Sequence, residues 1–307
     1  MPGTFNVLSL DGGGIRGLVT VVLLERLVAT PGLERLLERT DLIAGTSTGG
    51  LLALGIAHGL SLADMRDLYV TKGERIFDDS WRDDLVDLGK LRGADYDTGP
   101  LRKELKRLFG ETTLGKLGKK VLIPSFDLDN EDPANRSWKP KVFHNFPGKG
   151  SDAGEVAWKV GLYTSAAPTY FPSVDGFVDG GVYAGNPSMC ALAQTQDSRY
   201  APTPKLEQVR LLSLGTGTNL QYVAGATHDW GYVQWARPLI DLMLDGTAGI
   251  ADYQCRQLLG ERYHRLAPVF PSGVRFPLDD IDRIQDLIDF ATDVPLHATA
   301  DWLKRFW

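Results

Sequence analysis

The 307-residue chain has few cysteines, no long hydrophobic run and no surplus of positive charge. Its two cysteines, Cys190 and Cys255, are too few for a disulfide framework and show no metal-ligand spacing, so the sequence predicts no metal site. No apolar run approaches the roughly 20 residues of a membrane-spanning helix, and the N-terminus lacks the basic and apolar segments of a secretory leader. These absences favour a cytoplasmic protein.

The charge balance excludes further classes of partner. The chain carries 33 Lys and Arg against 39 Asp and Glu, a formal net charge of -6. A surplus of acid argues against nucleic acid as a partner, and against recruitment to anionic membranes by charge alone.

Short apolar runs alternate with segments of helical spacing, and glycines follow several of the runs. The runs predict strands at 6–10, 42–44, 120–126, 142–144, 177–178 and 209–214. Helical spacing predicts helices at 61–75, 99–109 and 155–163. Residues 77–97 and 127–141 are typical of loops. The alternation predicts an α/β fold of three layers, with a mostly parallel central sheet flanked by helices. We expect one domain over residues 1–307, in which residues 220–307 form a mainly helical part packed on the rest.

The most informative segment is Gly45-Thr46-Ser47-Thr48-Gly49, where an apolar run ends and a helical pattern begins. Gly-x-Ser-x-Gly between a strand and a helix is typical of a sharp elbow that exposes one serine at the end of a sheet. Gly45 and Gly49 would allow the strand and the helix to pass closely. Taken alone, the motif also fits a glycine-rich turn with an N-capping serine.

A second glycine-rich segment, 11–17 (Asp-Gly-Gly-Gly-Ile-Arg-Gly), follows the first predicted strand. Its glycines leave backbone N–H groups free to bind an anion at the start of the next helix. Two strands joined by one helix are parallel, so both glycine segments should lie at the same edge of the sheet. An anion-binding loop beside an exposed serine indicates an oxyanion hole beside a nucleophile.

The same glycines, Gly12, Gly14 and Gly17, also satisfy the dinucleotide-binding fingerprint. That reading requires an acidic residue near the end of the second strand to bind the ribose, and this strand ends in Gly45-Thr46-Ser47. We therefore predict no nucleotide cofactor.

A serine nucleophile needs a base. Asp179 stands at a predicted strand end before two glycines, a position typical of a site residue, although a plain Asp-Gly turn would read the same way. None of the five histidines (His58, His144, His228, His264 and His297) lies in a glycine-marked turn. The chain order Ser47, Asp179 and then His264 or His297 nevertheless keeps open a Ser-Asp-His triad of the α/β-hydrolase type.

Together these segments resemble the patatin-like phospholipase family. The resemblance covers roughly residues 5–220. It rests on segments 11–17, 45–50, 164–172 (Thr-Ser-Ala-Ala-Pro-Thr-Tyr-Phe-Pro), 179–181, 186–187 and 213–217. It implies a lipid acyl hydrolase with a Ser-Asp dyad and no cofactor, acting on a lipid or ester substrate at a membrane or micelle surface. Ser47 would be the nucleophile and Asp179 the general base. Gly12, Gly13 and Gly14 would supply the oxyanion donors, with Arg16 beside them.

Two further expectations accompany the resemblance. Trp81, Trp138 and Phe146, in the predicted loops, are candidates for contact with a lipid surface. A non-catalytic storage or scaffold protein on the same fold is the alternative of a different class, since a sequence alone does not demonstrate turnover.

Overall fold

The computed structural model describes residues 3–73, 96–200, 202–223 and 229–307. The strands are β1 (Phe5–Leu10), β2 (Leu42–Gly45), β3 (Lys120–Asp127), β4 (Lys139–His144), β5 (Phe177–Asp179), β6 (Val209–Leu214) and β7 (Tyr263–Leu266). The helices are α1 (Gly17–Val28), α2 (Thr48–His58), α3 (Leu62–Asp67), α5 (Gly99–Phe109), α6 (Ala157–Ser165), α7 (Gly181–Ala184), α8 (Ser188–Thr195), α9 (Tyr232–Leu259), α10 (Ile284–Asp293) and α11 (His297–Phe306). A π-helical segment, Leu68–Lys72, continues α3.

The strands form one mixed sheet in the order β4-β3-β2-β1-β6-β7. Neighbouring strands from β3 to β7 in that order are parallel, whereas β4 and β5 run antiparallel to β3. This confirms the predicted mostly parallel sheet and the adjacent, parallel placement of the two strands that precede the glycine segments.

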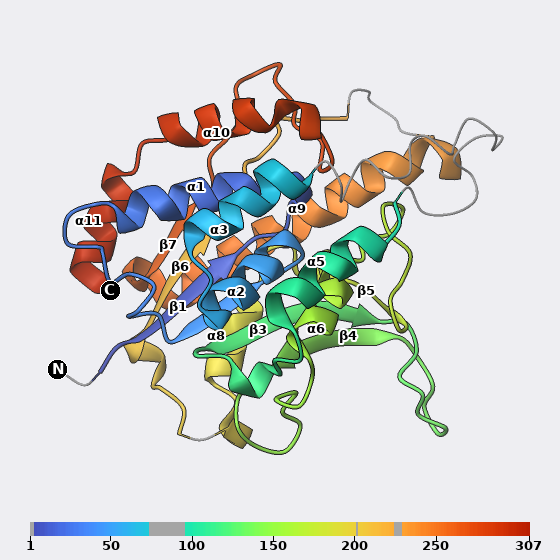
Figure 1. The fold of residues 1–307 in the computed structure, drawn as a ribbon, viewed down its shortest axis with the longest axis horizontal. Coiled ribbons are helices and arrows are strands. Elements are labelled where there is room, and N and C mark those ends of the chain that lie inside the picture. The colour runs from blue at the N-terminus through green and yellow to red at the C-terminus, as the bar shows by residue number, and fades with distance from the viewer. Residues whose placement is uncertain (1–2, 74–95, 201, 224–228) are drawn as a thin grey trace.

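Helices cover both faces of the sheet (Figure 1). Alternate residues of β1 supply two separate cores: Leu8 and Leu10 pack with α1, α2 and α6, whereas Val7 packs with α8 and α9. Alternate residues of a strand point to opposite faces of the sheet, and both faces are buried here. Apolar residues are therefore needed at successive positions, which explains the continuous apolar runs in the sequence. The three-layer prediction is confirmed.

The placement of β5 brings distant parts of the chain together. β2 pairs with β3 at residues 120–122, and β4 occupies the other edge of β3 along residues 122–127. β5 pairs with residues 125–127, so it takes the same edge of β3 as β2, beyond the point where β2 ends. The end of β5 at Asp179 therefore faces the end of β2 at Gly45, although 134 residues separate them in sequence.

Several predicted boundaries need correction. The predicted 61–75 helix is α-helical only to Asp67 and then becomes π-helical. α6 begins at Ala157 rather than at 155, and β4 begins at Lys139 rather than at 142. Most of the predicted loop 77–97, including Trp81, lies outside the described residues.

The C-terminal part contains helices α9, α10 and α11, and it also contributes strand β7, which the sequence does not predict. β7 pairs in parallel with β6, and α10 packs along α1. In the part of the chain that the structure describes, no helix combines the length and apolar character needed to cross a membrane.

Candidate active site

Ser47 stands at the junction of β2 and α2, in backbone that a side chain rarely adopts. It is the residue before the first turn of α2, with φ 56° and ψ −127°. A Cβ on Gly45 would overlap the backbone of Gly49, and a Cβ on Gly49 would overlap the carbonyl oxygens of Leu10 and Asp11. Both glycines are therefore required by close backbone approach, as the elbow motif predicts.

Thr164, at the end of α6, holds the elbow from the opposite side. Its hydroxyl accepts a hydrogen bond of 2.9 Å from the Ser47 N–H and donates one of 2.6 Å to the Pro124 carbonyl oxygen in β3. Through these two hydrogen bonds, Thr164 connects the strained residue to the buried strand β3. The Ser47 N–H is already used in one of them and is therefore not free to bind another acceptor. From its sequence, Thr164 is only the first residue of the 164–172 segment, and this contact is not predicted.

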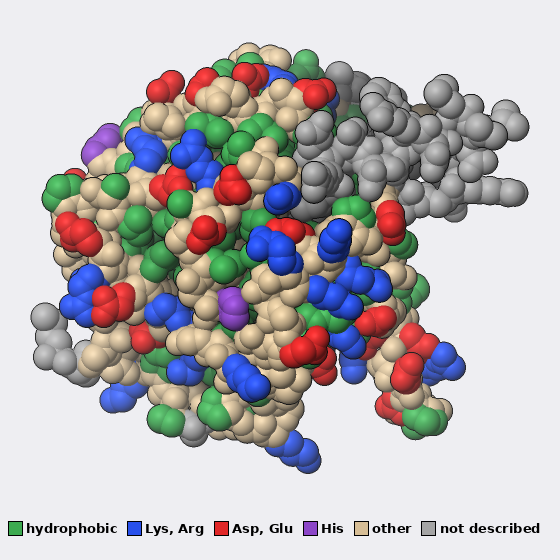
Figure 2. Space-filling view, in the orientation of Figure 1, with side chains coloured by type: hydrophobic (Ala, Val, Ile, Leu, Met, Phe, Trp, Pro, Cys, Tyr) green, Lys and Arg blue, Asp and Glu red, His purple; other side chains and the backbone are tan. Residues whose placement is uncertain are grey.

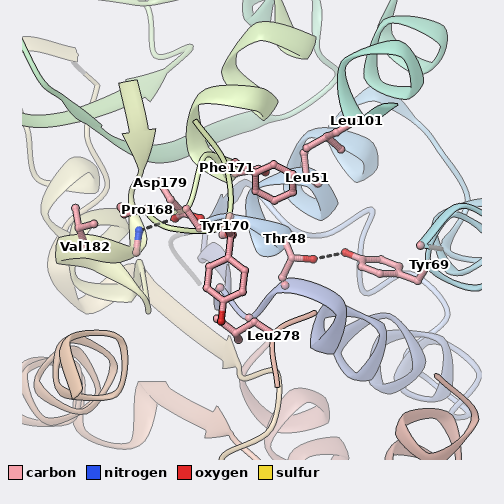
Figure 3. Close-up of a pocket in the computed structure, with 18 of the residues that line it drawn as sticks. Thr48, Leu51, Tyr69, Leu101, Pro168, Tyr170, Phe171, Asp179, Val182 and Leu278 are labelled. Carbon is pink, nitrogen blue, oxygen red and sulfur yellow. Dashed lines mark hydrogen bonds between the residues drawn. The ribbon is translucent and has the colours of Figure 1, made fainter. Parts of the chain in front are cut away.

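Asp179 ends β5 and is 4% exposed. Burial raises the pKa of its carboxyl group to about 7, against opposing hydrogen bonds from the Ser47 hydroxyl and the Gly181 N–H. The Gly181 bond is 2.7 Å long and fixes one carboxylate oxygen (Figure 3). The structure thus brings Ser47 and Asp179 together, and it gives the acid a pKa suited to accepting a proton near neutral pH.

The N–H groups of the glycine loop are not equivalent. The Gly12 N–H donates to the Gly185 carbonyl oxygen at 2.9 Å, whereas the N–H groups of Gly13 and Gly14 have no acceptor among the described residues. All three glycines line the cavity in front of Ser47. Gly13 and Gly14 are therefore the loop residues whose amides are free to bind an oxyanion.

Side chains from distant strands support the loop from behind. Thr216, after β6, donates a 2.8 Å hydrogen bond to the Gly12 carbonyl oxygen. Arg16 donates to the carbonyl oxygens of Gly13 and Gly217, so its guanidinium faces the back of the loop. The Asp11 carboxylate receives two hydrogen bonds, of 2.6 and 3.2 Å, from Arg265 in β7. The sequence predicts neither the hydrogen bond from Thr216 to Gly12 nor the pairing of Arg265 with Asp11.

The cavity beside Ser47 and Asp179 has a volume of about 260 Å³ and an apolar lining. Its walls come from the glycine loop, α2, α5, the 165–171 turn and the start of α7. The lining side chains include Leu51, Leu68, Leu101, Pro168, Tyr170, Phe171, Val182, Met243 and Leu278. Figure 3 shows Asp179 on one side and the hydrogen-bonded hydroxyls of Thr48 and Tyr69 on the other. An apolar pocket that ends at a serine and a carboxylate suits a substrate with a hydrocarbon chain.

The structure places no described histidine beside Ser47. His264 in β7 hydrogen-bonds the Thr299 hydroxyl at 2.9 Å and stacks on Trp302. His297 begins α11, and His58 ends α2 against Phe109. None of these residues lines the cavity, and His228 lies outside the described residues. The geometry therefore favours the dyad over a Ser-Asp-His triad.

The three aromatic residues expected to contact a lipid surface differ in their exposure. Trp138, in the loop before β4, is 73% exposed, as predicted. The prediction for Phe146 is wrong: Phe146 is buried, because Tyr200 packs over it and His144 lies edge-on to its ring. Trp81 falls outside the described residues.

Gly13→Ala should lower kcat for ester hydrolysis by about 100-fold, the usual cost of losing one oxyanion donor. A Cβ at Gly13 would lie 2.7 Å from the Thr216 Cβ and would overlap the Thr216 hydroxyl, so the loop must shift. Gly154→Ala is the matched control, because a Cβ there meets nothing within 4 Å. Steady-state kinetics should show full activity for the control; an unchanged kcat for Gly13→Ala would place the oxyanion site elsewhere.

Comparison with known proteins gives a consistent picture. Residues 8–192 match the family described as Patatin-like phospholipase. A cGAMP-activated phospholipase of Pseudomonas aeruginosa is 33% identical over 86% of this chain and 78% of its own length. Patatin-like protein 1 of rice (Oryza sativa subsp. indica) is 31% identical over 80% of this chain and 68% of its own length.

A mammalian protein is also similar. The 85/88 kDa calcium-independent phospholipase A2 of mouse is 29% identical over 92% of this chain, a match that covers 37% of the mouse protein.

Proposed function

This chain belongs to the patatin-like phospholipase family and is a lipid acyl hydrolase, and we propose that it cleaves fatty acyl esters through a Ser47–Asp179 dyad. The observation that carries the proposal is that Ser47 and the buried carboxyl of Asp179 line the same apolar cavity. The N–H groups of Gly13 and Gly14, which have no acceptor within the described part of the chain, add to it because both residues line the same cavity.

In the acylation step, Asp179 accepts the proton of the Ser47 hydroxyl while the serine oxygen attacks the acyl carbonyl carbon. The carbonyl oxygen gains negative charge and receives hydrogen bonds from the Gly13 and Gly14 amides. The tetrahedral intermediate collapses with loss of the alcohol, which takes the proton from Asp179.

Deacylation repeats these steps with water. Asp179 accepts a proton from the water molecule, which attacks the acyl-enzyme, and the same amides stabilise the second oxyanion. Collapse releases the fatty acid and returns the proton to Ser47. The proposal uses no metal ion.

Purified protein should release fatty acid from phosphatidylcholine dispersed in mixed micelles. The assay should be run with and without cGAMP, because the name of the Pseudomonas aeruginosa relative states that cGAMP activates that enzyme. Absence of fatty acid release and of p-nitrophenyl butyrate hydrolysis under both conditions would instead favour a non-catalytic protein on this fold.

The value of kcat/KM should rise with pH through an apparent pKa near 7 and then level off. Burial raises the pKa of Asp179 to about 7, and only the ionised carboxylate accepts the serine proton. p-Nitrophenyl butyrate suits this measurement because the substrate does not titrate between pH 5 and 9. A profile that is flat over this range would contradict the assignment of Asp179 as the base.

A further inference from the structure

Helix α9 carries an apolar stripe that the rest of the described chain leaves exposed. The stripe consists of Leu239, Leu242, Met243, Ile250 and Tyr253, each between 39% and 60% exposed. These positions follow the spacing i, i+3, i+4, i+11 and i+14, which places them on one face of an α-helix. At 1.5 Å per residue the α9 stripe is about 21 Å long.

The α9 stripe is separate from the face by which α9 joins the fold. Ala251, Cys255 and Leu259 are buried, and α9 packs against α7, α8 and β7. Helical periodicity puts these three residues about half a turn away from the stripe. Figure 1 shows the N-terminal half of α9 extending past the sheet. The helix therefore has one face for the core and an opposite apolar face directed outwards.

The α9 stripe continues into the substrate cavity. Met243 belongs to the stripe and also lines the cavity that contains Ser47 and Asp179. Leu278 and Tyr170 line the same cavity, so an apolar surface runs from the outer face of α9 towards the dyad.

We propose that the α9 stripe is the face that docks on a lipid surface and admits an acyl chain to the cavity. The inference rests on the proposed function, because it takes the cavity to be the acyl site. A helix that lies flat on a bilayer buries an apolar face of this kind below the headgroups. A second copy of the chain seated on the stripe would cover Met243, a wall of the cavity, and so fits the site less well.

Charge specifies the kind of lipid surface. The described charged residues beside the stripe are Asp245, Asp252 and Arg256, of which Asp252 and Arg256 form an ion pair. The whole chain has a net charge of -6, and acidic and basic side chains are interspersed over the face shown in Figure 2. Lys-rich and Arg-rich faces draw interfacial helices to anionic lipids, and α9 lacks such a face among its described side chains. Docking should therefore depend on apolar burial and favour zwitterionic membranes.

The test measures binding to phosphatidylcholine vesicles in a Ser47→Ala background, so that the vesicles stay intact. Adding Ile250→Glu and Tyr253→Glu should weaken partitioning at least tenfold, because two exposed apolar side chains become charged. Trp138→Glu tests the rival lipid-contact residue expected from the sequence: Trp138 is exposed but is not part of α9, so under the present proposal its replacement should leave partitioning unchanged. Replacing part of the phosphatidylcholine with phosphatidylglycerol should not strengthen binding.

In the active enzyme, which keeps Ser47, the double variant with Ile250→Glu and Tyr253→Glu should hydrolyse dissolved p-nitrophenyl butyrate at a rate within twofold of wild type. Neither Ile250 nor Tyr253 lines the cavity. Hydrolysis of vesicle phosphatidylcholine should fall with the partitioning. A thermal unfolding measurement shows whether the double variant with Ile250→Glu and Tyr253→Glu is folded. If it is not, the double variant with Ile250→Ser and Tyr253→Ser is measured in its place.

Unchanged partitioning of the α9 variants would overturn the proposal, as would an equal loss in Trp138→Glu. A wild-type dimer in sedimentation that the α9 variants dissociate, with vesicle binding retained, would assign the stripe to a second copy and also overturn it. Lack of all ester hydrolysis would refute the proposed function, whereas the partitioning data would still decide the role of α9.

Discussion

Ser47→Ala should reduce ester hydrolysis by several orders of magnitude, to less than about a hundredth of the wild-type rate. The Ser47 hydroxyl interacts with the buried Asp179 carboxyl in the cavity, and its loss should leave the cavity and the glycine loop intact. Steady-state assays with p-nitrophenyl butyrate measure the effect. Activity above a hundredth of wild type would show that another group attacks the ester.

Stability should respond differently to alanine and to glycine at this position. Alanine keeps a Cβ at φ 56° and therefore keeps the backbone strain, so Tm should be nearly unchanged. Glycine removes the Cβ, and relief of about 1–2 kcal/mol of net strain should raise Tm by a few degrees. Equal Tm values for Ser47→Ala and Ser47→Gly would show that the elbow stores little strain.

Asp179→Asn should be as inactive as Ser47→Ala, because an amide does not accept the serine proton. His264→Ala and His297→Ala provide the contrast. His264 contacts Thr299 and Trp302, and His297 begins a helix away from the cavity, so both variants should keep kcat/KM within a few-fold of wild type. In a Ser-Asp-His triad, loss of the histidine would cost roughly a thousandfold or more. A folded but inactive His264→Ala would refute the dyad.

The same aspartate should make stability depend on pH. Its carboxyl has a pKa of about 7 in the folded protein and an ordinary value of 3.8. A group with a raised folded pKa stabilises the protein below its unfolded pKa, and this contribution is lost as pH rises through the folded pKa. The Tm of Asp179→Asn minus that of wild type should therefore grow between pH 4 and 8 and change little above pH 8.

The strands, the elbow and the glycine loop could be predicted because each is encoded locally. β1, β2, β3 and β6 are buried on both faces and therefore read as apolar runs. The elbow reads from its glycines, whose missing Cβ atoms the packing requires. Asp179 was marked by the glycines that follow it, although its pairing with Ser47 depends on the β3–β5 contact, which no local pattern reveals.

Other features depend on partners that lie far away in the sequence. β7 is a short strand at the edge of the sheet in which His264 and Arg265 interrupt the apolar pattern, and both find polar partners in the fold. Arg265 is 254 residues from Asp11, so sequence inspection gives no sign of the pair. Phe146 resembled an exposed loop aromatic because its cover, Tyr200, comes 54 residues later.

In the proposed mechanism, Ser47 is the residue that becomes acylated. Labelling of the pure protein with a fluorophosphonate, followed by peptide mass spectrometry, tests it directly, because the reagent traps an activated serine as a covalent adduct. We expect one adduct per chain on the peptide that contains Ser47, no adduct in Ser47→Ala, and strongly slowed labelling in Asp179→Asn. An adduct on a different serine, or no adduct on a folded protein that hydrolyses esters, would contradict it.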